Sequence, residues 1–428
     1  MLETLWILLL SCFICVAATS AAADKAQHDI AWLSRHTATK THYTPGQVDT
    51  IADDYMVEQL QLVVRHGSRF PSDGDTSDIA ALLKKLARGK NQTLAWVHNF
   101  DNVYTPSRSG LLDLNGQREE YLHGQRVADQ FSDLLTHVVD SQGALTGLSS
   151  YCSWSQRTSQ SAVAFLTGLF SRKVTDQVPF MGYVLTQQQN NDSLIAMDDD
   201  CPAWDAQAKS NETDAFKERA LAPIAARLSR DLGVALEADD VATIYTGCAF
   251  EISHRRDAST FCTLLTRKEV EAAEYHEDLN YYYKYAYGRA LNSKVACALA
   301  QDLVQAMDDV VNGKDGAYRM TLKFGHTQTI VFLETFLGLF HDAKPLVANA
   351  SEAAIQKRMF RTSNIASFAS NVGLQLLSKD KEHYVRVVVS EAPVILPGCN
   401  AEVCSYALFR KVLASRLQCS FQDVCQKS

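Results

Sequence analysis

One short apolar run that ends in a compact charged loop constrains the fold of this 428-residue chain most strongly. Residues 60–64 read Leu-Gln-Leu-Val-Val, a pattern typical of a buried β-strand, and the run stops at Arg65 and His66. Segments with helical periodicity, and one further strand, follow it at residues 78–86, 117–139, 145–154 and 158–170. Because strands and helices alternate along the chain, we expect an α/β sheet.

The middle of the chain differs in character from the segments that flank it. Polar loops there separate segments of helical periodicity, among them residues 215–232 and 267–285. The earlier pattern then resumes, with helices predicted at residues 297–311 and 329–340 and strands at 319–324 and 384–389. We therefore expect an α/β core of residues 24–171 and 295–428, with a mainly α-helical domain, residues 172–294, inserted between its halves.

The overall charge argues against several classes of partner. Forty-one Lys and Arg residues oppose 49 Asp and Glu residues, which gives a net charge of −8. That balance disfavours nucleic acid or an acidic membrane as the main partner, although one local basic pocket remains compatible with it. With 20 glycines, 9 prolines and 46% hydrophobic residues, the chain is also not a disordered or low-complexity protein.

The N-terminus has the features of a secretory signal. Residues 5–18 are apolar apart from Ser11, and small residues follow before Asp24. This pattern predicts a signal peptide over residues 1–23. An uncleaved membrane anchor is the alternative, but the run is shorter than the roughly 20 residues that a helical span needs. We expect a protein that is secreted or lies in the secretory-pathway lumen, with no stable membrane span after signal cleavage.

Four Asn-X-Ser/Thr sequons agree with the secretory route. A single sequon is weak evidence, whereas four in one chain are suggestive of N-glycosylation. The candidate asparagines are Asn91, Asn191, Asn211 and Asn349.

The cysteines indicate an oxidising compartment, with one thiol left over. Two of the eleven lie within the predicted signal peptide, and the remaining nine cannot all pair with one another. Short spacings favour the pairs Cys248–Cys262, Cys399–Cys404 and Cys419–Cys425, and Cys201 could pair with Cys297 across the chain. Cys152, in an apolar stretch, then remains as the predicted buried thiol. Spacing does not prove connectivity, so these pairings are hypotheses.

Neither the cysteines nor the acidic run suggests a metal. The chain has no repeated Cys-X-X-Cys pair of the kind that binds zinc. Asp198 to Asp200 lack the spacing of an EF-hand calcium loop, so we expect them to form a solvated loop.

The charged loop after the first strand has the chemistry of an anion site. Arg65, His66, Gly67 and Arg69 lie within five residues, and ligands of α/β sheets bind beyond the carboxyl ends of strands. Arginine offers paired donors to phosphate oxygens, and glycine lets the backbone approach closely. A histidine beside such a clamp can attack phosphorus and form a covalent intermediate.

This Arg-His-Gly-X-Arg-X-Pro motif resembles the signature of the histidine acid phosphatases, branch 2 of the histidine phosphatases. The resemblance implies a phosphoglycerate-mutase-like α/β core with an inserted helical domain, and His66 as the phosphorylated nucleophile. Residues 156–162 resemble the segment that supplies a further arginine, Arg157, and residues 324–329 resemble the distal segment that supplies His326. The implied phosphate ligands are thus Arg65, Arg69, Arg157 and His326.

Within that family the chain is most similar to multiple inositol polyphosphate phosphatases. Residues 275–288, 361–371 and 397–399 carry the likeness, which spans essentially the whole mature chain. It implies an anionic phosphorylated small molecule as the substrate, such as inositol hexakisphosphate, and some such proteins act on 2,3-bisphosphoglycerate. Lys284 matches a lysine of these proteins and is a candidate substrate contact. No cofactor is implied, since arginines supply the positive charge. The oligomeric state stays open.

One residue departs from the family pattern. The distal segment of the inositol polyphosphate branch reads His-Ala-Glu, and its Glu donates a proton to the leaving alkoxide. Here the segment reads His326-Thr327-Gln328, and an amide cannot donate a proton at any useful pH. General acid catalysis contributes about 10²–10⁴-fold.

Three interpretations of this departure compete. The chain could be a slow phosphatase, it could borrow an acid from elsewhere, or it could be an inositol-phosphate-binding pseudoenzyme. Glu334 is a poor donor candidate, because it lies roughly 10 Å farther along the predicted helix at 1.5 Å per residue.

Overall fold

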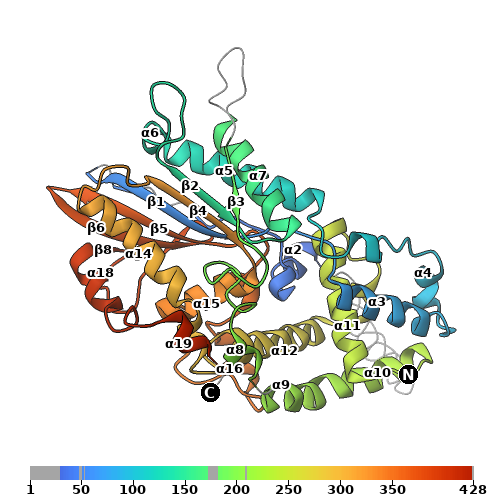
Figure 1. The fold of residues 1–428 in the computed structure, drawn as a ribbon. Helices are drawn as coiled ribbons and strands as arrows, with labels where there is room; N and C mark the ends of the chain where they lie inside the picture. Colours follow the sequence, from blue (N-terminus) through green and yellow to red (C-terminus); the bar gives the residue numbers. More distant parts are fainter. Residues whose placement is uncertain (1–28, 48–50, 53, 172–181, 208–209, 427–428) are drawn as a thin grey trace, which may run out of the picture.

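The structure is a computed structural model, and it describes residues 29–47, 51–52, 54–171, 182–207 and 210–426 (Figure 1). The predicted signal peptide, residues 1–23, lies outside the described residues.

The described residues form one eight-stranded sheet in the order β3-β2-β4-β1-β5-β6-β7, with β8 paired to β6. The strands are β1 (Met56–Arg65), β2 (Leu148–Cys152), β3 (Leu185–Thr186), β4 (Met320–Gly325), β5 (Asn371–Lys379), β6 (Glu382–Val389), β7 (Ala392–Val394) and β8 (Val403–Ser405). Strand β1 pairs in parallel with β4 and antiparallel with β5. The predicted first strand therefore lies at the centre of the sheet, where its parallel half meets its antiparallel half.

Helices surround the sheet and form a second region beside it (Figure 1). The longer helices are α3 (Asp73–Leu86), α5 (Leu114–Gln130), α7 (Gln156–Phe170), α10 (Ala222–Leu232), α11 (Ala238–Phe250), α12 (Arg267–Tyr285), α14 (Cys297–Val311), α15 (Thr327–Leu337) and α18 (Tyr406–Leu413). The shorter ones are α2 (Ile30–Leu33), α4 (Ala95–His98), α6 (Ser132–Leu135), α8 (Pro202–Asp205), α9 (Asn211–Phe216), α13 (Asn292–Val295), α16 (Glu352–Lys357), α17 (Thr362–Ile365) and α19 (Phe421–Cys425).

The side chains of β1 show how the sheet separates two helical layers. Leu62 and Val64 lie in the apolar cluster that includes α5 and α7, whereas Val63 lies in the cluster that includes α14, α15 and α18. On that second face the Gln61 Nε2 amide donates to the carbonyl oxygen of Leu303 in α14 at 2.7 Å. Because successive side chains of a strand point to opposite faces, the core is a three-layer α/β/α arrangement.

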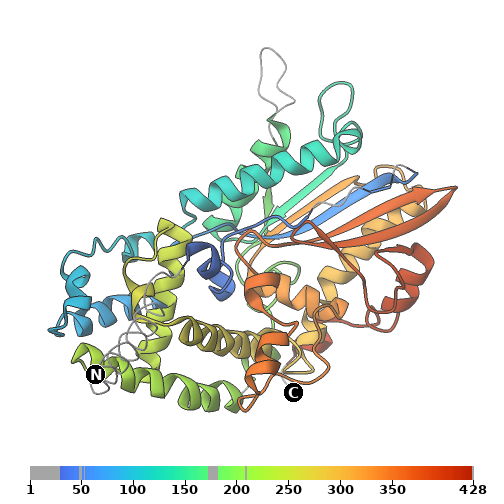
Figure 2. The same cartoon turned by 180° about the vertical axis from the view of Figure 1, so that it is seen from behind.

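A separate apolar cluster holds the helical region together. It joins buried residues of α3, α10, α11 and α12, and Figure 2 shows these helices gathered beside the sheet rather than over it. Helix α3 precedes residue 172 in the chain but packs in this cluster. The division into a core and an insertion over 172–294 stays a prediction.

The predicted elements were right in kind, but one helix is interrupted and several elements, among them β5 and α11, were not predicted. The helix predicted over 117–139 is interrupted, because Phe131 leaves helical geometry with φ −118° and ψ 38° between α5 and α6. Strand β5 was not predicted. Its polar Asn371 and Gln375 are buried along with its apolar residues, so the strand lacks the exposed polar alternation that marks a half-buried strand.

The eight candidate cysteines all form disulfides, but two predicted pairings were wrong. Cys248–Cys262 and Cys399–Cys404 are confirmed, and Cys152 is the buried free thiol. Instead of Cys419–Cys425 and Cys201–Cys297, the structure forms Cys201–Cys425 and Cys297–Cys419. The reason is the path of the C-terminus, which folds back so that α19 packs against α8 and α13. Short spacing could not reveal bridges that join residues 224 and 122 positions apart.

The four sequon asparagines, Asn91, Asn191, Asn211 and Asn349, are exposed, and their glycosylation stays a prediction. Among the described residues, no helix combines the length and apolarity that crossing a bilayer would require.

Candidate active site

Three neighbouring strand ends bring the predicted site residues together. Arg65 pairs with Gly325 in the parallel register of β1 and β4, and Cys152 of β2 pairs with Phe324. The residues that follow these strands therefore lie side by side. The ring centroids of His66 and His326 are 5.6 Å apart.

The loop after β1 is held tightly against helix α5. A Cβ atom on Gly67 would come within 2.4 Å of the Gly116 carbonyl oxygen, so only glycine fits there. The backbone amide of Gly67 donates to Ser161 Oγ at 3.1 Å, and Ser68 donates its amide and its hydroxyl to Glu119 at 2.8 and 2.9 Å. Burial raises the pKa of Glu119 to about 7, with Ser68 opposing the shift. The loop geometry is thus fixed before any ligand binds.

The hydrogen bond of His66 determines which ring nitrogen is free. Its Nδ1 lies 2.8 Å from the carbonyl oxygen of Gly67. A carbonyl oxygen only accepts, so Nδ1 carries the proton and Nε2 keeps its lone pair. Burial, then Arg157, Arg65, His326 and Arg69, lower the pKa of His66 well below its usual value. The ring is therefore neutral in mildly acidic solution, the state that a nucleophilic histidine needs.

Arg65 is buried and anchored. Its Nη1 donates to the carbonyl oxygens of Thr39 and Ala366, and its guanidinium lies 4.4 Å from the ring centroid of Phe368. Burial lowers its pKa to about 9, and Arg69 and Arg157 act in the same direction. Arg65 thus has a structural role as well as its predicted role in the clamp.

Three guanidinium groups each carry one unpaired hydrogen-bond donor. The Nε–H groups of Arg65, Arg69 and Arg157 are buried and have no hydrogen-bond partner among the described residues. Burial lowers the pKa of each, and Arg69 further lowers those of the other two. Buried unpaired donors of like charge are costly. An anion that accepts these hydrogen bonds would therefore fit the arrangement.

His326 is linked to this group by Arg157. An Arg157 guanidinium donates from Nη2 to His326 Nδ1 at 3.2 Å, so the Nε2 of His326 carries the proton and donates to Ser153 Oγ at 2.8 Å. Burial, followed by repulsion from Arg157, Arg69 and Arg65, holds the pKa of His326 well below its usual value. His326 is thus neutral and held in one orientation.

The two remaining predicted site residues, Gln328 and Lys284, both interact with Asp198. Gln328 is the second residue of α15, and its side chain interacts electrostatically with that of Asp198. The Lys284 ammonium lies 5.7 Å from the ring centroid of Trp204 and 5.2 Å from that of Tyr285, and it also interacts electrostatically with Asp198.

The prediction of a solvated loop at residues 198–200 was wrong for Asp198, which is only 8% exposed. The loop packs on the start of α15, and the Cys201–Cys425 disulfide holds its end.

Several residues around the clamp were missed as site residues. Lys40 and Tyr281 interact electrostatically with Arg69. Ser153, Ser161 and Glu119 make the hydrogen bonds described above. Residues 39–43, which precede the first strand and include Lys40, are a weaker match to the family, and this was the available signal for Lys40. Ser161 and Tyr281 lie in the segments 156–162 and 275–288 that carry the resemblance, whereas Ser153 and Glu119 lie in none of the segments quoted above.

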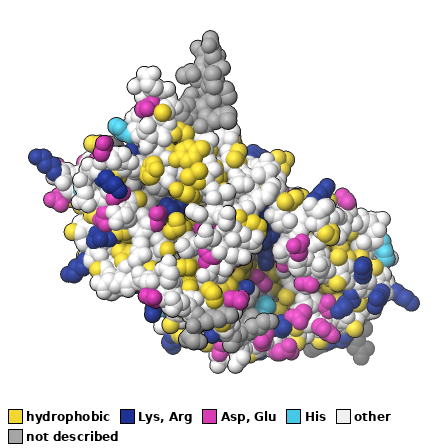
Figure 3. All heavy atoms as spheres, viewed as in Figure 1, with side chains coloured by type: hydrophobic (Ala, Val, Ile, Leu, Met, Phe, Trp, Pro, Cys, Tyr) yellow, Lys and Arg dark blue, Asp and Glu magenta, His cyan; other side chains and the backbone are white. Residues whose placement is uncertain are grey.

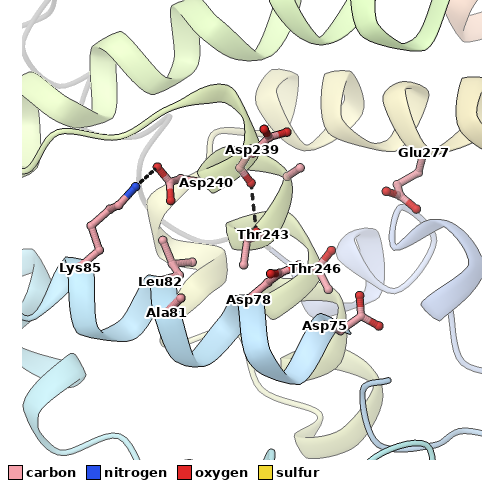
Figure 4. Close-up of a pocket in the computed structure, with 11 residues that line it drawn as sticks. Asp75, Asp78, Ala81, Leu82, Lys85, Asp239, Asp240, Thr243, Thr246 and Glu277 are labelled. Carbon is pink, nitrogen blue, oxygen red and sulfur yellow. Dashed lines mark hydrogen bonds and ion pairs between the residues drawn. The ribbon is translucent and has the colours of Figure 1, made fainter. Parts of the chain in front are cut away.

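An acidic groove lies beside the arginine group. It has a volume of about 540 Å³ and lies between α3, α11 and α12. Its carboxylates are Asp75, Asp78, Asp239, Asp240 and Glu277, and Figure 4 shows them around one opening. In the space-filling view, acidic side chains gather over the lower part of the helical region (Figure 3). Lys85 neutralises part of this charge through an ion pair with Asp240 at 2.6 Å.

Comparison with known proteins identifies the family. Residues 56–390 match the model of the histidine phosphatase superfamily, branch 2. The chain belongs to that superfamily.

The relatives it resembles include two phosphatases. The chain is 28% identical over 391 residues to multiple inositol polyphosphate phosphatase 1 of Gallus gallus, covering 86% of this chain and 84% of the relative. It is also 28% identical over 383 residues to a thiamine-repressible acid phosphatase of Schizosaccharomyces pombe, covering 84% and 80%.

Solved structures confirm the expected α/β class. The phytase of D. castellii superimposes with a TM-score of 0.77 at 20% identity and covers 93% of this chain and 88% of its own. The multiple inositol polyphosphate phosphatase of Bifidobacterium longum, in complex with inositol hexasulfate, gives a TM-score of 0.70 at 15% identity, covering 92% and 100%.

Proposed function

We propose that this chain hydrolyses phosphomonoesters of inositol polyphosphates through a phosphohistidine on His66. One observation carries the proposal. Three arginines with buried, unpaired Nε–H donors converge on a neutral histidine whose Nε2 keeps its lone pair. A phosphate group supplies acceptors for these donors and a negative charge, and it places phosphorus beside that nitrogen.

In the proposed first step, Arg65, Arg69 and Arg157 bind the equatorial phosphate oxygens. His326 joins them by turning its Nε2–H from Ser153 to a phosphate oxygen. The Nε2 lone pair of His66 attacks phosphorus in line, an N–P bond forms, and the ester P–O bond breaks. The leaving oxygen takes the bonding electrons and must gain a proton. The arginines offset the charge that gathers on the phosphoryl oxygens, so the step itself uses only residues of this chain.

In the second step, water attacks the phosphohistidine. The N–P bond breaks, its electrons return to Nε2, and inorganic phosphate leaves with one proton while the other is released. The bond from His66 Nδ1 to the Gly67 carbonyl persists through both steps, so the same nitrogen is regenerated.

The names of the relatives support the substrate class. One is a multiple inositol polyphosphate phosphatase, and two structural neighbours are described as a phytase and as a complex with inositol hexasulfate. Inositol polyphosphates carry several phosphates on one ring, and a clamp of buried arginines binds one of them at a time. The alternative assignment, a pseudoenzyme that only binds such compounds, follows from Gln328 and predicts binding without turnover.

We also propose a secreted or secretory-lumen location. Four disulfides are consistent with an oxidising compartment, and cytosolic proteins rarely keep such bonds.

The test is phosphate release from inositol hexakisphosphate across pH 4–8, with the wild type compared with His66→Ala. We expect release by the wild type and none above background by the variant. Binding of the non-hydrolysable inositol hexasulfate by both proteins, without release of phosphate by either, would support the pseudoenzyme instead.

A further inference from the structure

The leaving oxygen in the proposed reaction needs a proton, and the position that supplies it in similar proteins is Gln328. Gln328 is half-buried at the start of α15, two residues after His326. Its amide binds a proton too weakly, and releases one too reluctantly, to serve as an acid. A donor for this site therefore has to come from another element that reaches the same place.

The loop before Cys201 lies over the start of α15. Thr329 Oγ1 donates to the carbonyl oxygen of Ile195 at 2.6 Å and accepts from the His326 amide at 2.9 Å. A Cβ atom on Gly325 would lie 2.6 Å from Ile195 Cγ2, which shows how closely the loop packs on the end of β4. Ile195 is consequently in contact with the segment that carries His326.

The same loop also contacts the start of α7, where Arg157 stands. Trp154 donates its indole N–H to Asp199 Oδ2 at 3.4 Å, and Asp199 interacts electrostatically with Arg157. The loop thus bridges the two helix starts that carry Arg157 and His326.

Asp198 is the buried carboxyl of this loop. It is 8% exposed, its Oδ1 is buried without a hydrogen-bond partner among the described residues, and its carboxyl group interacts electrostatically with the side chain of Gln328. A carboxyl group beside the Gln328 amide lies close to the place where similar proteins hold their acid. An unsatisfied carboxyl oxygen at that depth also has capacity for one more bond.

We propose that Asp198 is the proton donor to the leaving oxygen, in place of the residue that Gln328 replaces. The proposal rests on the proposed function and deepens it. Gln328 then serves to orient Asp198 through its neighbouring side-chain amide. Contact with the leaving oxygen is made directly or through one water molecule, as is common for general acids in ligand-free structures.

The groups around Asp198 suit this role. Burial, and then the neighbouring Asp199, raise the pKa of Asp198 to about 6, while Gln328 and Lys284 oppose the shift. Tyr285 also faces this carboxyl from α12, and it is neutral because burial holds its pKa well above the usual value. A carboxylic acid with such a pKa is protonated in mildly acidic solution, where His66 is still neutral.

The step balances. The O–H bond of protonated Asp198 breaks as the P–O ester bond breaks, the proton passes to the leaving oxygen, and a neutral alcohol departs. The resulting Asp198 carboxylate then accepts a proton from the water that attacks phosphohistidine, so the acid is restored for the next turnover.

The test compares leaving groups. Inositol hexakisphosphate releases an alkoxide that needs a proton, whereas p-nitrophenyl phosphate releases a stable phenolate. For Asp198→Asn we expect kcat on inositol hexakisphosphate to fall by about 10²–10⁴-fold and kcat on p-nitrophenyl phosphate to change by less than about fivefold. Asp200→Asn, which removes a charge from the same loop, is the matched control and should leave both rates near those of the wild type.

An exchange of the two side chains provides a second test. The double variant Asp198→Asn with Gln328→Glu keeps an amide and a carboxyl side by side, with their places reversed. We expect its kcat on inositol hexakisphosphate to be at least tenfold higher than that of Asp198→Asn alone. A structural role of Asp198 predicts no recovery and a parallel loss on both substrates.

The outcomes separate the two proposals. Equal rates of Asp198→Asn and wild type on inositol hexakisphosphate would overturn the role of Asp198 while leaving the proposed function intact. If the wild type turns over neither substrate, the proposed function fails instead. A parallel loss on both substrates, without recovery in the exchanged variant, would also overturn the role of Asp198.

Discussion

The arginine group at the strand ends and the acidic groove beside it are neighbours with opposite charge. The first holds the buried, unpaired Nε–H donors of Arg65, Arg69 and Arg157, and the second is lined by carboxylates of α3, α11 and α12. The two regions meet at Lys40. Its ammonium pairs with Glu277 at 3.4 Å, and although burial acts against the shift, Glu277 and Asp75 hold its pKa above the usual value.

The contrast in charge indicates where selectivity for phosphate would arise. We expect the arginine group to favour one phosphate strongly, because its Nε–H donors are buried and unpaired. We expect the groove to repel further phosphates on the same ring, but Asp78 and Asp239 are exposed, so salt should screen this repulsion. Local charge at the strand ends, rather than the net charge of −8, therefore governs binding.

The largest effect should come from the nucleophile. His66→Ala removes the attacking nitrogen but none of the guanidinium donors, so we expect kcat on inositol hexakisphosphate to fall by about 10⁴-fold or more. Calorimetric titration with inositol hexasulfate should show that binding is retained. Substantial residual turnover would contradict the phosphohistidine route.

Arg157→Gln should have the next largest effect. Arg157 bonds His326 but no backbone carbonyl, so its loss should lower kcat/KM by about 10²–10³-fold. Because a buried like charge is removed, we expect the melting temperature of the ligand-free variant to stay equal or rise. Arg230→Gln, on the exposed face of α10, is the control and should change neither quantity.

Neutralising the groove should have a modest effect that depends on the substrate. In Asp78→Asn combined with Asp239→Asn, two exposed carboxylates are lost, and we expect KM for inositol hexakisphosphate to fall by about 3- to 10-fold at low salt. The effect should shrink at high salt and be absent for p-nitrophenyl phosphate. The control is Asp315→Asn, which lies just before β4 at the other end of the sheet. Unchanged KM would show that the groove does not face the substrate.

Lys284→Ala should have the smallest effect. Lys284 lowers the pKa of Asp198, so its removal should let Asp198 stay protonated to higher pH. We expect the alkaline limb of the kcat profile on inositol hexakisphosphate, near pH 6 in the wild type, to move to higher pH. The change in kcat at pH 5 should be less than about threefold. A shift to lower pH would contradict the assigned electrostatics.

Much of this site could be predicted because its residues are close in sequence to strand ends. A buried strand that stops at Arg65 fixes the place of the loop, and the parallel register then brings Arg157 and His326 beside it. Local sequence patterns were therefore enough to predict these residues, and they also indicated the disulfides Cys248–Cys262 and Cys399–Cys404.

The rest depended on contacts between distant segments. The burial of Asp198 requires the loop to pack on α15 and a disulfide to the C-terminus, neither of which leaves a pattern near residue 198. The polar residues of β5 are buried against other elements, so their sequence resembles neither an exposed nor an apolar strand. The acidic groove likewise combines residues from three helices far apart in the chain.

The most direct test of the account is chemical trapping on His66. The protein is mixed for milliseconds with a phosphorus-labelled ester that has a good leaving group, and it is denatured at alkaline pH, where a phosphohistidine survives. We expect label on the peptide that contains His66 and no label in His66→Ala. Added unlabelled substrate should remove the label from the wild type at the rate of turnover. Sustained turnover with no label on that peptide would contradict it.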